Sequence, residues 1–423
     1  MKRWSWTLCA VLVAGACTQD SPTEAGAGLL PPDAIRTYEI VLTPDRFLQS
    51  DTAFGLYSEP ASADYTLLAN TYEGSLNARA LLRYLIPQAI TVIDSAGLTQ
   101  IDSMPIFFEG RLVVAIDTVA SSEPPATLNV YRSTELWDRS SASWQFRVDT
   151  GGVQIPWTQP GGSPGVLGGY EIWQGGDSVF VRVDSATIAV WADTTNPASG
   201  AVLEVGTADR RLRTAPPVLR LRARSTLHPD TVFEVNLAPG RTFIYEPDLP
   251  DSVATPRVGG TPSWRTVLRL RERLDTLTVP CPGVPGCTVR LGDVTINYAA
   301  LRLQPVQPPA GFAPELALDV AMHALLPSPL LPLQRSPLTN AVGFTNTPVP
   351  VSSFTAPGAP VVEVPATEFL RLVFAPPDTA VTFVPSHLAL LQAGPIRTFG
   401  FGQFAELPSM RLIVTLGREL QVP

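Results

Sequence analysis

The two halves of this chain carry the same kinds of short apolar segment in the same order. The matched pairs are 38–46 with 233–241, 79–83 with 265–269, 111–114 with 300–303, 127–130 with 315–318, 180–183 with 369–372, and 217–221 with 409–413. The separation between partners is nearly constant along the series. A repeat of this length predicts two copies of one domain rather than a solenoid of small units.

The matched segments have the pattern of β-strands. Apolar and polar residues alternate in Phe180–Asp184 and in Leu219–Arg222, which places one set of side chains in a core and the other in water. Turn-forming stretches such as Asp149–Gly152 separate the segments. The 43 prolines favour strand connections over helices, and the one helical candidate, 321–325, ends quickly at Pro327.

The first residues have the order of a secretory signal. Lys2 and Arg3 precede an apolar run from Trp4 to Val13, and Ala14–Ala16 are small. Cys17 follows at once, and this arrangement resembles the bacterial lipoprotein signal, in which the peptide is cut before the cysteine and the new N-terminus is acylated. The alternative is an ordinary secretory signal cleaved nearby, with Cys17 incidental.

Together these patterns predict an all-β protein of two tandem β-sandwich modules, each jelly-roll-like with long loops. The expected divisions are a signal peptide at 1–16, an acylated Cys17 with a flexible tether to residue 33, module 1 at 34–228 and module 2 at 229–423. We expect a lipid-anchored protein of the bacterial cell envelope, with the outer membrane as the favoured location.

Two further cysteines, Cys281 and Cys287, flank a Pro/Gly loop. Outside the cytoplasm two cysteines so placed are expected to form a local disulfide. Zinc is disfavoured, because no histidine or third cysteine lies nearby in the sequence.

Module 1 resembles the DNRLRE (disaggregatase-related) family of extracellular β-sandwich modules. The resemblance lies in 77–84, 111–116, 127–132, Trp137–Asp138, Ser143–Trp144 and 216–221. Phe54–Tyr57 is similar to a segment of bacterial surface lipoproteins of unknown function. The resemblance implies a fold like that of carbohydrate-binding modules, with Trp137 and Trp144 in the core.

Two other tryptophans are candidates for ligand binding. Trp157 and Trp173 stand among proline and glycine, a loop context, and an exposed indole ring can stack on a sugar ring. The alternative is core packing, because tryptophan is highly buried on average.

Catalytic motifs are weak. Asp149–Gly151 resembles the Asp-Thr-Gly loop of aspartic proteases, but the required second loop is missing from module 2, so a tight turn is the favoured interpretation. His228, His323 and His387 each stand alone, and no G-x-S-x-G sequence occurs. We therefore predict that the protein is not an enzyme.

No cofactor is predicted. Several aspartates offer oxygen ligands for a structural Ca²⁺, but they form no EF-hand-like loop and are expected to be solvated. They are Asp94, Asp102, Asp117, Asp177 and Asp184. The 38 acidic and 30 basic residues give a formal charge of −8 without a basic cluster along the sequence, so nucleic acid is not expected as a partner.

The sequence as a whole favours a non-catalytic cell-surface lipoprotein. Its membrane contact would be the lipid on Cys17, and its modules would bind polysaccharide or another envelope protein, with avidity from two linked modules. The first alternative is a structural subunit of an envelope protein complex, and the second is an accessory hydrolase.

Overall fold

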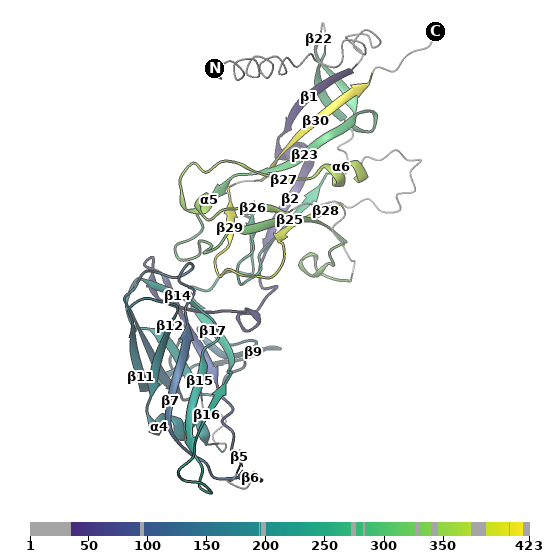
Figure 1. Ribbon diagram of the computed structural model, residues 1–423. Helices are drawn as coiled ribbons and strands as arrows, with labels where there is room; N and C mark the ends of the chain where they lie inside the picture. Colours follow the sequence, from purple (N-terminus) through teal and green to yellow (C-terminus); the bar gives the residue numbers. More distant parts are fainter. Residues whose placement is uncertain are drawn as a thin grey trace, which may run out of the picture.

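Strands dominate the computed structural model, and two β-sandwiches lie end to end (Figure 1). The described residues are 35–417 apart from 94–96, 194, 196–199, 272–275, 282–283, 327–329, 340–345, 374–385 and 406. We call the sandwich formed by 66–246 the insert sandwich. It interrupts the chain of the other, the host sandwich, which combines 35–54 with 252–417. The all-β sandwich fold expected from the sequence is confirmed, whereas the predicted signal peptide, tether and Cys17 lie outside the described residues.

The insert sandwich packs a four-stranded sheet against a larger one. The smaller sheet has the order β12 (Ser178–Val183), β7 (Ile106–Ala115), β15 (Val218–Arg224), β16 (Val232–Leu237). The larger has β11 (Pro164–Trp173), β8 (Ala126–Ser133), β13 (Ala201–Val205), β4 (Leu76–Arg83) and β17 (Gly240–Glu246), with β3 (Thr66–Tyr72) and β14 (Arg210–Thr214) beside the other end of β4. Alternating apolar residues such as Leu82, Leu112 and Leu128 fill the core between them.

The host sandwich is built in the same way. One sheet has the order β27 (Val362–Pro365), β23 (Thr295–Leu303), β30 (Ser409–Gly417), β1 (Ile35–Leu42). The other has β26 (Thr347–Val349), β25 (Leu318–Leu325), β28 (His387–Gln392), β20 (Arg265–Leu270), β2 (Leu48–Phe54), β18 (Ser252–Val253). A small sheet joins β19 (Arg257–Val258), β29 (Gly402–Phe404) and β24 (Pro305–Val306). Leu268, Leu301 and Leu412 belong to the core.

Short elements complete the chain. Three hairpins are β5 (Ile90–Ile93) with β6 (Thr99–Asp102), β9 (Phe146–Thr150) with β10 (Val153–Pro156), and β21 (Thr276–Cys281) with β22 (Val284–Arg290). The helices are α3 (Pro44–Phe47), α4 (Ser185–Ala192), α5 (Ser352–Thr355) and α6 (Thr367–Val373), and single 3₁₀ turns lie at Pro60–Ser62, Leu291–Asp293 and Leu333–Arg335. No helix among the described residues is both long and apolar enough to cross a bilayer.

The two sandwiches share one strand order. In the smaller sheets β12-β7-β15-β16 corresponds to β27-β23-β30-β1, and in the larger β11-β8-β13-β4-β17 corresponds to β26-β25-β28-β20-β2. The register agrees as well, because Leu112 lies opposite Leu219 in one sheet and Leu301 lies opposite Met410 in the other.

The strand pairing crosses the boundary predicted at residues 228 and 229. β1 and β2 pair with β30 and β20 of the C-terminal half, whereas β16 and β17 pair with β15 and β4 of the N-terminal half. Neither sandwich is therefore a single stretch of chain cut at that boundary. The loop 225–231 after β15 lets β16 fold back on it as a hairpin, so the edge of β15 is occupied and β1 pairs with β30 instead.

Three local expectations are corrected by the sheets. The segment 321–325 lies in β25, a strand paired on both sides and buried on both faces, so it shows no period of two. By register the counterpart of 127–130 is 319–322 rather than 315–318. The counterpart of β12 is β27, because each is the edge strand beside β7 or β23, whereas residues 369–372 lie in α6.

A packed joint connects the two sandwiches. Tyr65 and Phe243 of the insert sandwich share a core cluster with residues of the host sandwich, namely Trp264, Phe312, Phe399 and Phe401. Arg211 Nη1 lies 3.9 Å from Glu315 Oε1 across the joint, and Gly311 N donates to Glu73 Oε2 at 2.6 Å.

Candidate functional site

The tryptophans proposed to stack on sugars are buried. Trp157 is 5% exposed and donates its Nε1 hydrogen to Ser143 O at 2.9 Å, and Trp173 is 2% exposed and donates to Gly176 O at 3.0 Å. Trp157 packs on Leu81 and on other buried residues of the larger insert sheet. The proline and glycine around these two tryptophans indicated loops. In the structure Trp157 packs against the larger insert sheet, and Trp173 is the last residue of β11. Neither ring presents a free face to solvent, so the prediction that Trp157 and Trp173 stack on sugar rings is wrong.

Trp137 and Trp144 are also buried, in a cluster with Leu81 that is separate from the core between the two insert sheets. Arginines cover both rings: the guanidinium carbon of Arg83 lies 5.0 Å from the Trp137 ring centroid, and that of Arg79 lies 5.2 Å from Trp144. Trp137 and Trp144, like Trp157, therefore have a structural role, because they cover the side chain of Leu81 on the larger insert sheet.

The Asp-Thr-Gly segment is a hairpin turn. Asp149 and Thr150 end β9, and Gly151 and Gly152 adopt φ values of 57° and 86° before β10 begins. Such positive φ values favour glycine and suit a two-residue hairpin. Asp149 accepts a hydrogen bond from Gln154 Nε2 at 3.3 Å.

The aspartates singled out as calcium candidates make hydrogen bonds within the protein. Asp184 caps α4 by accepting from Thr187 N at 2.6 Å, and Asp117 pairs with Arg213. Asp94 lies outside the described residues. In the part of the chain that is described, no three His, Cys, Asp or Glu residues gather as metal ligands would.

The three histidines are far apart in the sequence. Nδ1 of His323 lies 3.3 Å from Thr339 O, and Nδ1 of His387 lies 2.8 Å from Ser386 Oγ. Burial and the nearby Arg269 lower the pKa of His387. Cys287 lies in β22 and is disulfide-bonded, whereas the side chain of Cys281 is outside the described residues, so their pairing stays a prediction.

The outer face of the smaller insert sheet carries a row of arginines. In the register of the sheet Arg182 on β12 lies opposite Arg111 on β7, and Arg111 lies opposite Arg220 on β15. Their chain neighbours, such as Leu112 and Val181, point into the core, so these three side chains project outward. We call Arg182, Arg111 and Arg220 the arginine row.

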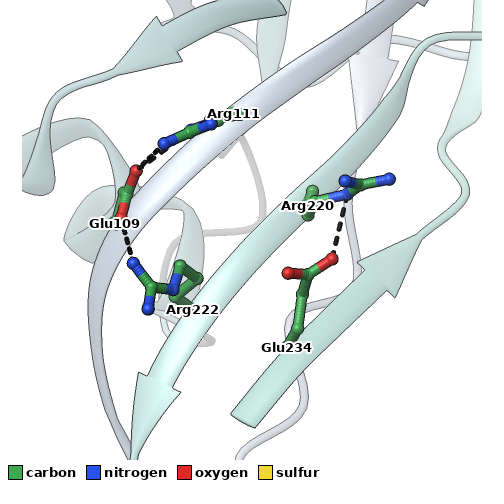
Figure 2. Close-up of a pocket in the computed structure, with 5 residues that line it drawn as sticks. All are labelled: Glu109, Arg111, Arg220, Arg222 and Glu234. Atoms are coloured by element: carbon green, nitrogen blue, oxygen red, sulfur yellow. Dashed lines mark hydrogen bonds and ion pairs between the residues drawn. The ribbon is translucent and has the colours of Figure 1, made fainter. Parts of the chain in front are cut away.

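A cavity of about 270 Å³ lies at this row and is lined by Glu109, Arg111, Arg220, Arg222 and Glu234. Figure 2 shows how these five side chains lie. Glu109 bridges two arginines, with Oε1 2.6 Å from Arg111 Nη2 and Oε2 2.9 Å from Arg222 Nη1. Hydrogen bonds from Arg111 and Arg222 lower the pKa of Glu109. Arg220 Nε lies 3.1 Å from Glu234 Oε1.

The outward side chains of this sheet carry more positive than negative charge. Among the described residues of this face, the only acidic side chains beside Arg111, Arg182, Arg220, Arg222 and Arg224 are Glu109 and Glu234. Arg182 has no acidic partner among the described residues. This excess stands out on a chain whose formal charge is −8.

The host sandwich lacks the row. The positions that correspond to Arg182, Arg111 and Arg220 are filled by Pro365, Ala300 and Arg411. Arg411 is neutralised, because its Nε lies 2.8 Å from Glu39 Oε1 and its Nη1 lies 3.2 Å from Glu363 Oε2. The hydrogen bonds from Glu39 and Glu363 raise the pKa of Arg411.

Sequence reasoning missed this site. The alternation in Leu219–Arg222 identified a strand, but the row depends on the register of three strands that are far apart in the chain. Comparison adds no precedent, since no protein-family model, curated protein or solved structure matches the chain. The resemblance to DNRLRE modules therefore rests on the short segments alone.

Proposed function

We propose that the protein is a non-catalytic binding protein of the bacterial cell envelope, anchored by lipid on Cys17, whose insert sandwich binds an acidic polysaccharide across the arginine row. The observation that carries this proposal is the direct cross-strand adjacency of Arg182, Arg111 and Arg220.

The energetics of the row support a ligand. Like charges directly opposite each other destabilise a sheet. Glu109 and Glu234 offset the charges of Arg111 and Arg220, whereas Arg182 adds a positive charge with no acidic partner among the described residues, and an anion lying over the row would balance it. Each guanidinium presents a planar fork of donors that fits carboxylate, sulfate or phosphate groups. Neighbouring strands lie about 4.8 Å apart, so the row extends across roughly 10 Å of an open face and suits an extended polymer.

The modest charge of the site favours a polysaccharide over a nucleic acid. Duplex DNA carries one charge per ~1.7 Å of its axis and demands a dense basic surface. Glu109 and Glu234 flank the row and would repel so dense a polyanion. A polysaccharide with about one acidic group per sugar unit spaces its charges more widely and can place them on the arginines alone.

Affinity electrophoresis of the full chain tests this function. Gels containing polygalacturonate, which carries one carboxylate per sugar unit, should retard the wild-type protein, and gels containing neutral dextran should not. The R182Q and R220Q variants should lose most of the retardation. R411Q, which removes the corresponding arginine of the host sandwich, should keep it.

Added salt should weaken the retardation, because it screens exposed charges. Wild-type protein that migrates alike in acidic and neutral gels would refute the proposal, as would an equal loss in R411Q.

A further inference from the structure

The end of the insert sandwich that lies away from the host sandwich exposes a group of apolar side chains. This end carries the β5–β6 hairpin at the bottom of Figure 1. Six of its apolar residues are between 38% and 72% exposed, and we call them the apolar tip: Ile101, Met104, Ile106, Phe108, Leu227 and Val232.

These side chains form one surface. In the sheet register Ile106 on β7 lies opposite Arg224 on β15, and Arg224 lies opposite Val232 on β16. All three are exposed, so they form a row on the outer face at this end. Phe108 lies nearby on β7, and Arg222 and Arg224 lie over its ring.

A buried carboxylate holds the loops of the tip together. Asp102, which is 2% exposed, accepts hydrogen bonds from Ser225 Oγ at 2.7 Å, Thr226 N at 2.6 Å, Thr226 Oγ1 at 2.8 Å and Met104 N at 3.0 Å. Burial raises the pKa of Asp102, but these hydrogen bonds outweigh it and hold the pKa well below its usual range. Asp102 thereby ties the backbone at Met104 to the loop that carries Ser225 and Thr226, and Leu227 N donates to Ser225 Oγ in the same loop. The side chains of Met104 and Leu227 face water.

Two cations border the apolar surface. The guanidinium carbons of Arg222 and Arg224 lie 5.6 and 5.5 Å from the centroid of the Phe108 ring. Arg222 forms an ion pair with Glu109, which also pairs with Arg111, whereas Arg224 has no acidic partner among the described residues. The tip therefore combines exposed aliphatic side chains with positive charge at their edge.

We propose that the apolar tip docks on a phospholipid bilayer that contains anionic headgroups. The aliphatic side chains enter the interface between headgroups and acyl chains, and Arg222 and Arg224 contact lipid phosphates. Exposed apolar patches mark membrane or protein contacts. The border of arginines favours a bilayer with a negative surface, to which each nearby arginine adds attraction. The tip lies at the end of an elongated molecule that is farthest from the host sandwich (Figure 1).

This inference does not depend on the polysaccharide function. Docking through the tip uses Arg222 and Arg224, and it leaves the arginine row facing sideways along the sheet. A lipid contact at this end would hold the row close to glycans that lie on a membrane surface.

A fluorescent label at the tip tests the proposal in the full chain. An environment-sensitive dye is attached in the M104C variant, and a matched dye is attached in V119C, a loop position that is 82% exposed and outside the tip. Vesicles contain brominated phosphatidylcholine with or without phosphatidylglycerol. We expect a blue shift and quenching of the dye at 104 with phosphatidylglycerol vesicles, and several-fold less with phosphatidylcholine alone.

The dye at 119 distinguishes docking of the tip from attachment through a lipid anchor, since it should stay in water in every vesicle. Introducing I101D into the M104C protein should abolish the quenching, and R224Q should weaken it. A dye at 104 that stays in water, equal quenching at 104 and 119, or quenching that survives I101D would each overturn the proposal.

I101D and R224Q both replace exposed side chains, and a melting curve like that of the wild type would verify that each variant is folded. R182Q should lose polysaccharide retardation and keep quenching, whereas I101D should do the reverse, so the two proposals can fail separately.

Discussion

Arg220 on β15 lies directly opposite Arg111 on β7, whereas the corresponding arginine of the host sandwich, Arg411, lies opposite Ala300. Cross-strand pairs change sheet stability by roughly 0.2–1 kcal/mol each, and like charges act against the fold. Glu109 and Glu234 offset the charges of Arg111 and Arg220, but Arg182, which lies opposite Arg111 without an acidic partner among the described residues, leaves the insert sandwich a local electrostatic cost that the host sandwich avoids. The cost is local to one face of one sheet, which is where a ligand of opposite charge would relieve it.

Replacing Arg182 should stabilise the free protein. R182T removes one like-charge neighbour of Arg111 without breaking an ion pair among the described residues, so we expect a gain of about 0.2–1 kcal/mol. Threonine also suits a strand. Thermal melting at low and high salt measures the gain, which should shrink as salt screens the charges. The matched R411T variant should lose stability, because it removes the contacts to Glu39 and Glu363. A lower melting temperature for R182T at low salt would contradict this view.

The ion pairs of Glu109 should make the insert sandwich sensitive to acid. Hydrogen bonds from Arg111 and Arg222 hold the pKa of Glu109 below its ordinary value of 4.5 in the folded state. A carboxyl group with a lowered pKa contributes stability that is present above 4.5 and is lost as the pH falls through the folded-state pKa. In urea unfolding, E109Q should therefore be less stable than wild type at pH 7, and the difference should shrink toward pH 3.

The matched control for the acid effect is N236A, which changes a side chain that does not titrate. Asn236 accepts a hydrogen bond from Arg220 on the same face, and the cost of losing it should not depend on the ionisation of Glu109. A difference between E109Q and wild type that is the same at pH 7 and pH 3 would show that the ion pairs do not contribute.

Local patterns in the sequence predicted local structure well. The alternation in Leu219–Arg222 gave a strand with its leucines buried and its arginines exposed, and Asp149–Gly152 gave a hairpin turn. The strand β25 was not predicted from the sequence. A strand with neighbours on both edges and apolar cover on both faces does not alternate apolar and polar residues, and the prediction of strands depends on that alternation.

The pairing of β1 and the burial of Trp157 depend on distant contacts. β1 and β16 belong to matched segments, so either could pair with β15, and the direct connection through the loop 225–231 favours β16. The surroundings of Trp157 indicate a loop, but only the fold places that loop across Leu81. The arginine row likewise follows from the register of β12, β7 and β15, which no single segment specifies.

Fragments cut at different boundaries should differ sharply in folding. A fragment of residues 57–250 contains every strand of the insert sandwich, and we expect it to give a cooperative melting transition. A fragment of residues 34–228 lacks β16 and β17, so the edges of β15 and β4 are exposed while β1 and β2 lose their partners. Circular dichroism and limited proteolysis should show the second fragment to be unfolded or aggregated. Equal cooperativity of both fragments would contradict the strand pairing described above.

The joint between the sandwiches should depend on Glu315. Its Oε2 accepts hydrogen bonds from Phe399 N at 3.1 Å and Gly400 N at 3.2 Å, and Arg211 of the insert sandwich lies 3.9 Å from its Oε1. E315A leaves two buried N–H groups without this acceptor, and each unsatisfied group costs about 1–3 kcal/mol. Calorimetry should show a clearly lower melting temperature and separate transitions for the two sandwiches. The control E368A removes an exposed carboxylate paired with Arg371 and should change stability by less than about 1 kcal/mol. If E315A melts like E368A, the carboxylate does not hold the joint, which then depends on the aromatic cluster around Phe399 and on contacts such as that of Gly311 N with Glu73.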